Sequence, residues 1–513
     1  MENFTLTELQ QSSIAQMKQM SSCILALSPG CGKTLTVLCF VRDLLTGNND
    51  KCLFFIPKSA RAAFEKEMKT RIKEDYILIK AGKQVPYSEI VKHRYIFIEN
   101  TLIHKYIEDL VSLANTNACH LVIDEAHSLQ SPSSVFSKAA WEVRCYCKRI
   151  VAMTATPLMN SIEGLFNLCH FVYPRIFNSW FKFRSRYCIT KENTIRMKSK
   201  SGAVIQRKVL EIVGYQNMQE LNEVLDKLII KGCVRYNVNF EFLECPLDEQ
   251  SEKAYQFASN GLFDYLYHPE KAKEKAKNKK NSKEDSTEAK DFGSRLHDLQ
   301  RVCDGSDSSF DENFVSNKMK LMCQKVFEIM QRNESTLIYF EYIDTLELAE
   351  KILLQNQEML GFKALYKLTG AEKEDQRAKI ESSLGLKEII LCSQAASQSR
   401  NLQRANNIIC FHCAFSVGRT IQVLGRICRV DSTYDKQNIY FISVSDTIDT
   451  YKTSLLKNHT ALINALLGME SLGTLNTLNN EECNYVDVDL GTERKMLKST
   501  MLWRRNKNRN KRG

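Results

Sequence analysis

The chain has 513 residues, of which 43% are hydrophobic, so it is long enough to bury more than one core. Its formal net charge of +11 favours polyanionic partners. No apolar run approaches the roughly 18 residues of a membrane span, and the N-terminus lacks a basic segment followed by an apolar stretch, so a membrane protein and a secreted protein are not expected. Many of the 18 cysteines stand inside apolar runs, which favours a reducing, intracellular compartment.

Short apolar runs alternate with helical stretches through the first third of the chain. The runs are Cys23–Leu27, Cys52–Ile56, Tyr95–Ile98, His120–Ile123 and Arg149–Met153. Helical periodicity fills Thr34–Leu45 and Ala60–Arg71 between them. Similar runs return at Thr336–Phe340, Ile389–Cys392, Asn407–Phe411 and Ile439–Ile442. Buried strands that alternate with helices predict an α/β fold with two parallel sheets, each covered on both faces.

The remaining segments differ in composition. We predict a first lobe at residues 1–178, a mainly helical and linker region at 179–312, a second lobe at 313–470 and a C-terminal extension at 471–513. Within the linker region, residues 270–291 have no large apolar side chain and alternate Lys with Glu and Asp, which fits a mobile insertion or a solvated charged helix. The last eleven residues carry six Lys or Arg and no acid. This basic tail could bind phosphates, direct nuclear import or solubilise the chain end.

A glycine-containing loop follows the first apolar run. Its residues are Ser28, Pro29, Gly30, Cys31, Gly32, Lys33 and Thr34. The loop joins a strand to a helix, where backbone N–H groups can cradle a triphosphate, Lys33 can reach the outer phosphates and Thr34 can hold Mg²⁺. Leu27 occupies the position of the usual first glycine. The alternative is an ordinary glycine turn.

An acidic pair follows another buried run. Asp124 and Glu125 stand after Leu121–Ile123, at the end of a strand where open α/β sheets bind their ligands. Asp124 could hold Mg²⁺ while Glu125 deprotonates water. The alternative is that the pair caps the next helix.

The segment Gln422–Arg429, almost four hundred residues after the glycine loop, carries Arg426 and Arg429 at helical i, i+3 spacing. An arginine is always charged and its planar fork matches phosphate oxygens, so this pair can stabilise a phosphoryl group during transfer. We therefore interpret the chain as a nucleotide-driven machine.

These motifs, in this order, with Thr154–Pro157 between them, resemble the superfamily-two helicases and translocases. The residues after Pro157, up to Leu168, bring the resemblance closest to the Swi/Snf-type DNA-dependent ATPases. The resemblance implies two RecA-like lobes. Ala396, Ser397 and Ser399 replace glycines of that family, and this divergence suggests a compact viral member.

The resemblance also implies a role for individual residues. The residues expected to bind ATP are Gln10, Ser28, Pro29, Gly30, Cys31, Gly32, Lys33 and Thr34, with Thr34 and Asp124 on the metal. The residues expected in catalysis are Glu125, Gln422, Arg426 and Arg429. Those expected to couple hydrolysis to lobe movement are His127, Thr154, Ala155 and Thr156. Those expected along the nucleic acid are Pro57, Lys58, Thr101 and Asn401, where ordinary turn and helix-start chemistry is the alternative.

The function implied by this resemblance is ATP-dependent translocation on nucleic acid, with ATP and Mg²⁺ as cofactors and double-stranded DNA favoured as partner. Two alternatives stay open: a strand-separating DNA or RNA helicase, and a nucleotide-gated clamp or transcription-complex subunit. We expect no membrane partner. The expected setting is a viral or nuclear DNA transaction such as transcription, repair or remodelling, with a transcription or replication complex as partner. The expected location is the nucleus or a cytoplasmic viral factory, with packaging in virions as a further expectation.

Overall fold

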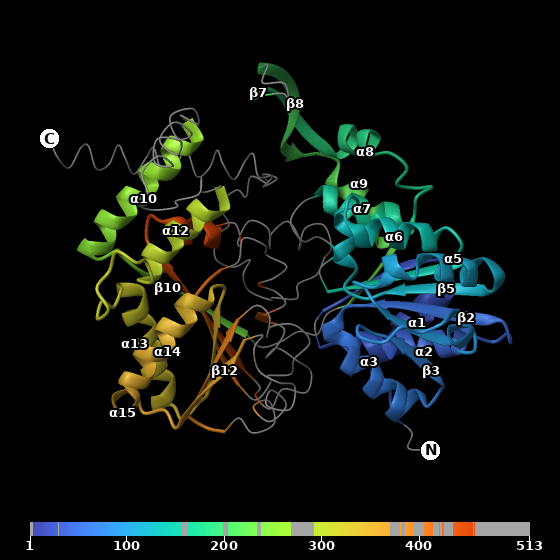
Figure 1. The fold of residues 1–513 in the computed structure, drawn as a ribbon, viewed down its shortest axis with the longest axis horizontal. Coiled ribbons are helices and arrows are strands. Elements are labelled where there is room, and N and C mark those ends of the chain that lie inside the picture. Colours follow the sequence, from blue (N-terminus) through green and yellow to red (C-terminus); the bar gives the residue numbers. More distant parts are fainter. Residues whose placement is uncertain are drawn as a thin grey trace.

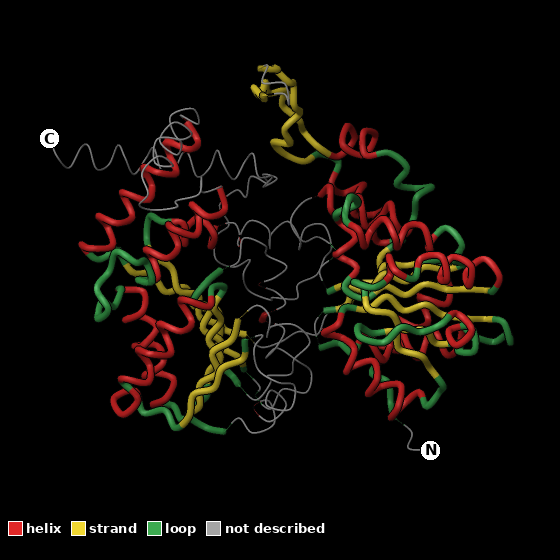
Figure 2. Tube along the Cα trace, in the orientation of Figure 1, coloured by secondary structure: helices red, strands yellow, loops and turns green. Residues whose placement is uncertain are grey.

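The structure, a computed structural model, describes most of the first 454 residues. The described residues are 4–28, 30–155, 157, 162–198, 204–232, 238–267, 292–369, 380, 385–393, 405–413, 420, 423–424, 434, 436–454 and 456. All of their strands except one hairpin gather into two sheets in separate parts of the molecule, each flanked by helices (Figures 1 and 2). The two α/β parallel-sheet domains predicted from the sequence are thereby confirmed. The charged segment 270–291 and the basic tail lie outside the described residues.

The first sheet has seven strands in the order β3-β4-β2-β5-β6-β1-β9, and all of its pairings are parallel. The strands are β1 (Cys23–Leu27), β2 (Asp50–Ile56), β3 (Tyr76–Ile79), β4 (Tyr95–Glu99), β5 (Ala118–Ile123), β6 (Arg149–Thr154) and β9 (Ile229–Gly232). Five of them coincide with the predicted apolar runs. The sequence analysis missed β3 and β9, which have only four residues each.

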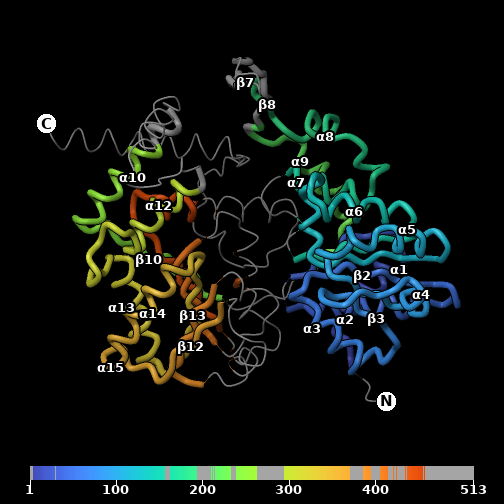
Figure 3. Tube along the Cα trace, viewed as in Figure 1, coloured from blue at the N-terminus to red at the C-terminus, as the bar shows by residue number. Residues whose placement is uncertain are grey.

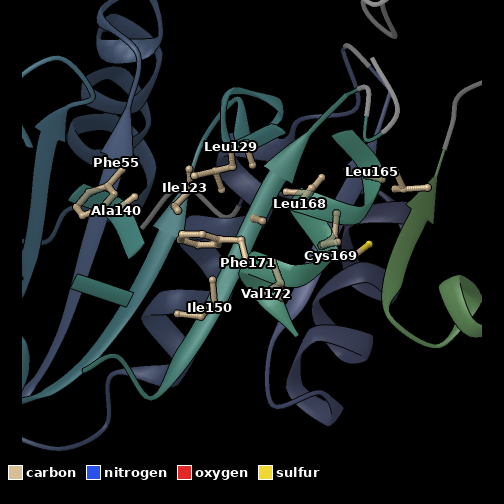
Figure 4. Close-up of a cluster of buried hydrophobic side chains, with 14 of the residues drawn as sticks. Phe55, Ile123, Leu129, Ala140, Ile150, Leu165, Leu168, Cys169, Phe171 and Val172 are labelled. Atoms are coloured by element: carbon tan, nitrogen blue, oxygen red, sulfur yellow. The ribbon is translucent and has the colours of Figure 1, made fainter. Parts of the chain in front are cut away.

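Successive side chains of the first sheet's strands pack on opposite faces. In β1, Leu25 and Leu27 belong to one buried cluster, together with side chains of α1 (Glu8–Gln19), α2 (Lys33–Leu44) and α3 (Arg61–Glu67). Ile24 and Ala26 belong to another, with α5 (Ile107–Thr116), α6 (Val135–Arg144) and α7 (Ile162–Val172). Figure 4 shows part of this second face, where α7 side chains lie beside those of β5 and β6. Burial of both faces explains why the strands read as continuous apolar runs.

Shorter elements complete this part of the molecule. They are α4 (Tyr87–Ile90), α8 (Trp180–Tyr187), α9 (Met218–Asp226), the 3-10 turns η1 (Lys58–Ala60), η3 (Ile103–Lys105) and η4 (Ala126–Gln130), and the π-helical turn η2 (Met68–Ile72). Strands β7 (Cys188–Lys198) and β8 (Val204–Tyr215) form a separate antiparallel hairpin that projects from the first sheet's part of the molecule (Figure 1).

The second sheet has six strands in the order β10-β15-β14-β11-β13-β12, again all parallel. They are β10 (Val238–Cys245), β11 (Thr336–Phe340), β12 (Ala364–Leu368), β13 (Glu388–Ser393), β14 (Asn407–Cys410) and β15 (Gln437–Val444). Figure 3 follows the chain through both sheets, from blue segments in the first to orange ones in the second.

The region 179–312 was predicted to be mainly helical. In the structure it also supplies strands to both sheets. Strand β9 pairs with β1, and β10 pairs with β15 over eight residues. The sequence analysis missed β10 because this strand is only half-buried and carries Glu241 and Glu244. An edge strand of this kind lacks the apolar run of a central strand.

Helices α13 (Asn317–Gln331), α14 (Ile343–Gln355) and α15 (Gln357–Leu360) pack on one face of the second sheet. Helices α10 (Glu249–Tyr267) and α12 (Phe292–Asp304) form a further cluster with Val444, Ile448 and Tyr451. Among the helices that the structure describes, none is long and apolar enough to cross a bilayer.

A buried charge network joins the elements of the second sheet's domain. Asp304, at the end of α12, accepts hydrogen bonds from His412 Nε2 at 2.6 Å and from Lys318 Nζ at 2.9 Å. Lys318 also lies 2.8 Å from Asp449, and the Gln300 amide donates to both carboxylates. All five side chains are buried. Burial by itself would raise the pKa of Asp304, but His412 and Lys318 outweigh it and hold that pKa well below its usual range.

Replacing Lys318 by methionine is expected to destabilise this domain by about 3–5 kcal/mol, because two buried carboxylates would lose their shared cation. Hydrogen exchange of the α13 amides, with a denaturant titration, measures the effect. Lys320→Met on the same helix is the matched control, since Lys320 is exposed. Equal protection in the two variants would contradict this account of the network.

Candidate nucleotide site

The glycine loop turns directly from β1 into α2. Gly30 and Gly32 have φ values of 81° and 72°, which side chains other than glycine rarely adopt. Lys33 Nζ donates to the backbone oxygens of Leu27 at 2.8 Å and Ser28 at 3.2 Å, so the ammonium group lies over the loop. Thr34 stands half-buried in the first turn of α2. The chain therefore forms a glycine loop at a helix N-terminus, where backbone donors favour anions.

Gln10 lies against this loop. Its backbone N–H and side-chain oxygen complete a capping box with Thr7, and its Nε2 donates to the Gly32 oxygen at 3.5 Å. A Cβ on Gly32 would lie 2.4 Å from Gln10 Nε2. The positive φ of Gly32 favours glycine at this position, and the contact places Gln10 against the loop predicted to bind ATP.

The acidic pair stands at the carboxyl end of β5, on the same edge of the sheet as the glycine loop. The Asp124 carboxylate is buried and accepts a hydrogen bond from the Glu125 backbone N–H at 2.9 Å. Glu125 adopts φ 49°, a left-handed conformation that costs a non-glycine residue roughly 1–2 kcal/mol. Its carbonyl oxygen accepts from Ser128 Oγ, and Oε2 of its half-exposed carboxylate lies 3.2 Å from His127 Nδ1. Because of this turn, the side-chain carboxylates of Asp124 and Glu125 point in different directions.

The residues present fit a magnesium nucleotide. Burial and then the charge of Glu125 raise the pKa of Asp124 to about 7, while Lys33 acts in the opposite direction. A bound cation would stabilise the ionised form of such a carboxylate. Ser28 Oγ is buried and has no hydrogen-bond partner among the described residues, so it could donate to a phosphate. The described residues hold no cluster of three or more His, Cys, Asp or Glu that could bind a metal by themselves.

The segment after β6 comes next along this edge. Thr154 and Ala155 are buried, whereas Thr156 and Pro29 lie outside the described residues. Gln130, which the sequence analysis did not single out, donates from Nε2 to the Pro157 oxygen at 2.9 Å. Its only signal in the sequence is its position five residues after Glu125.

Three of the residues predicted to contact nucleic acid lie close to one another. Pro57 and Lys58 follow β2, and Thr101 follows the adjacent β4, where the Asn100 N–H donates to the Ile56 oxygen at 2.9 Å. Lys58 and Thr101 are exposed. The sequence analysis also missed an ion pair beneath them. The buried Glu99 bonds to Arg61 at 3.1 Å and fixes the start of α3 against the end of β4.

The second-lobe residues of the predicted site, Asn401, Gln422, Arg426 and Arg429, lie outside the described residues. Val423 and Leu424, three and two positions before Arg426, are described and buried. They belong to the same apolar cluster as Leu337 and Tyr339 of β11. The segment just before the arginines is therefore anchored in a buried core.

A strand–glycine loop–helix unit, an acidic strand end and a second parallel sheet are together typical of two-lobed P-loop proteins. Comparison with known families agrees: the model of the SNF2-related domain matches residues 9–307, and that of the helicase conserved C-terminal domain matches residues 317–431. The first match alone covers more than half of the chain. The protein belongs to the SNF2-related domain family, and the predicted Swi/Snf-type resemblance is confirmed.

Individual relatives are similar at low identity. Over 437 residues the chain is 23% identical to the chromatin structure-remodeling complex subunit snf21 of Schizosaccharomyces pombe, covering 80% of this chain and 34% of that protein. Over 470 residues it is 23% identical to the CHD3-type chromatin-remodeling factor CHR7 of Arabidopsis thaliana, covering 88% and 36%. The chain thus spans about a third of the length of these relatives.

A solved structure, the Sulfolobus solfataricus SWI2/SNF2 ATPase core in complex with dsDNA, is also similar. It is 17% identical, with a TM-score of 0.39, over 94% of this chain and 97% of that one.

Proposed function

We propose that the chain hydrolyses ATP with Mg²⁺ in its first lobe and uses the energy to move along double-stranded DNA. One observation supports this most: a single edge of the first sheet carries Lys33, the Asp124–Glu125 pair, the segment from Thr154, and the exposed Lys58 and Thr101. The residues for ATP hydrolysis and those for contact with DNA would then lie at the same edge of the sheet. Membership of the SNF2-related domain family supports the same proposal.

Each residue has a task in the proposed hydrolysis. The glycine loop binds the triphosphate through its backbone N–H groups, and Lys33 moves from its two carbonyl partners to the outer phosphates. Thr34 and Asp124 would hold Mg²⁺, which would supply positive charge against the phosphate oxygens. Glu125 orients water and takes its proton, and Gln10 lies where it could contact the nucleotide base.

The arginines of the second lobe make hydrolysis depend on both lobes. In the proposal, Arg426 and Arg429 reach the phosphates only when the lobes close, with Gln422 on the same segment. Closure then shifts Pro57, Lys58, Thr101 and Asn401 along the nucleic-acid backbone. In the proposal, a change at the Asp124–Glu125 pair is transmitted to the lobe movement by four residues, His127, Thr154, Ala155 and Thr156.

The biological setting is part of the proposal. The relatives are described as chromatin-remodelling proteins, and another, STH1/NPS1 of Saccharomyces cerevisiae, as a nuclear protein. These descriptions support DNA in the nucleus as the substrate. Action in a transcription or replication complex, and a viral setting for this divergent chain, extend the same proposal.

The rate of ATP hydrolysis with duplex DNA, single-stranded DNA and RNA, compared at equal nucleotide concentration, tests the proposal. We expect the duplex to stimulate hydrolysis most, and Lys33→Ala to hydrolyse ATP under none of these conditions. Indifference of the wild-type rate to all three nucleic acids would contradict the proposed partner.

A further inference from the structure

Gln130 connects the acidic pair to the segment after β6. It ends η4, the 3-10 turn that begins directly after Glu125. From there its Nε2 donates to the Pro157 oxygen at 2.9 Å, across 27 residues of sequence. Its own backbone oxygen accepts from Asn167 Nδ2 of α7, also at 2.9 Å. Gln130 is therefore bonded on one side to Pro157 and on the other to α7.

The space for this side chain depends on one glycine. A Cβ at Gly164 of α7 would lie 2.4 Å from Gln130 Oε1 and 3.0 Å from its Cδ. Gly164 is buried within the helix, where alanine would form the better helix. Glycine is thus unfavourable for α7 by itself, and at this position it leaves room for the Gln130 side chain in the conformation that bonds to Pro157.

Helix α7 and the η4 turn also pack against each other. Leu129, next to Gln130, is buried in the same cluster as Leu165 and Leu168 of α7. In Figure 4, Leu168 lies between Leu129 and Leu165. At its other end, η4 is tied to Glu125 through the hydrogen bond from Ser128 Oγ to the Glu125 oxygen at 3.0 Å. A displacement at Glu125 therefore has a short, bonded path to Pro157.

From this arrangement we infer that Gln130 is a positioning residue, which couples the state of the Asp124–Glu125 pair to the position of Pro157. The inference rests on the proposed function and adds a residue to it. Gln130 acts by holding other groups in position. Its loss should therefore reduce the rate of hydrolysis with nucleic acid more than the rate without it.

Four variants test the inference: Gln130→Ala removes the bond, Gln130→Glu keeps the shape but loses the amide donor, Gly164→Ala displaces the side chain, and the fourth combines the two alanines. We expect each to reduce the duplex-stimulated rate by about three- to tenfold, the value of one hydrogen bond. The unstimulated rate and the KM for ATP should stay within about twofold of wild type, because one local bond is lost. The double variant should resemble the single ones, since both remove the same contact.

Glu163→Ala is the matched control, because Glu163 neighbours Gly164 on α7 but is exposed. It should keep the wild-type ratio of stimulated to unstimulated rate. A thermal unfolding midpoint for each variant separates coupling from general destabilisation. If wild type is stimulated and the Gln130 and Gly164 variants keep the same ratio, the inference is wrong and the proposed function stands. If wild type is not stimulated by any nucleic acid, the proposed function itself fails.

Discussion

Glu125→Gln is expected to slow ATP hydrolysis by about 10²–10⁴-fold, the usual contribution of a general base. Glutamine has nearly the same shape as glutamate but cannot accept a proton from water. The left-handed turn at Glu125 and the bond from its N–H to Asp124 involve the backbone, so they should persist in the variant. Single-turnover hydrolysis measures the chemical step, and a fluorescent ATP analogue measures binding.

ATP binding should stay close to that of wild type, because Lys33 and the glycine loop are unchanged. The control is Glu163→Ala, which removes an exposed carboxylate elsewhere in the same lobe and should hydrolyse ATP normally. Wild-type hydrolysis by Glu125→Gln would assign the base to another residue. Loss of ATP binding in the same variant would instead give Glu125 a structural role in the loop.

Arg429→Ala should reduce hydrolysis by about 10³–10⁵-fold, the range observed for a lost arginine finger. The physical reason is that a fixed guanidinium stabilises charge that develops only in the transition state. Resting nucleotide binding, which depends on the first lobe, should be largely intact. Steady-state hydrolysis with saturating duplex DNA measures this effect.

Lys363→Ala is the control for Arg429→Ala, because it removes an exposed cation from the same lobe. Its rate should equal that of wild type. If Arg429→Ala hydrolysed ATP normally, a site shared by the two lobes would be excluded, and the first lobe would have to act alone.

Much of the fold follows from hydrophobic patterning. Central strands such as β1 and β11 are buried on both faces, so they appear as apolar runs between helices, and their positions were predicted to within one or two residues. The glycine loop and the acidic pair were predictable for a related reason. Each motif lies at the carboxyl end of such a strand. The position of the strand in the sequence therefore predicts which edge of the sheet carries the motif.

Other features depend on contacts that spacing does not report. β10 is an edge strand whose pattern includes glutamates, and it joins β15 about 200 residues later. Asp304 and His412 are likewise brought together by the fold across 108 positions. Gln130 is a polar residue in a short turn, and its bonds to Pro157 and Asn167 and its contact with Gly164 are visible only in the structure. Long-range polar pairing of this kind has no periodic signature in one sequence.

The displacement of a third strand from intact duplex DNA most directly tests movement along DNA. With ATP and Mg²⁺, wild type should release the third strand without separating the duplex beneath it, and Glu125→Gln should release none. DNA-stimulated hydrolysis without any displacement would contradict translocation and favour a nucleotide-gated clamp. Separation of a tailed duplex, with the triplex left in place, would favour a strand-separating helicase.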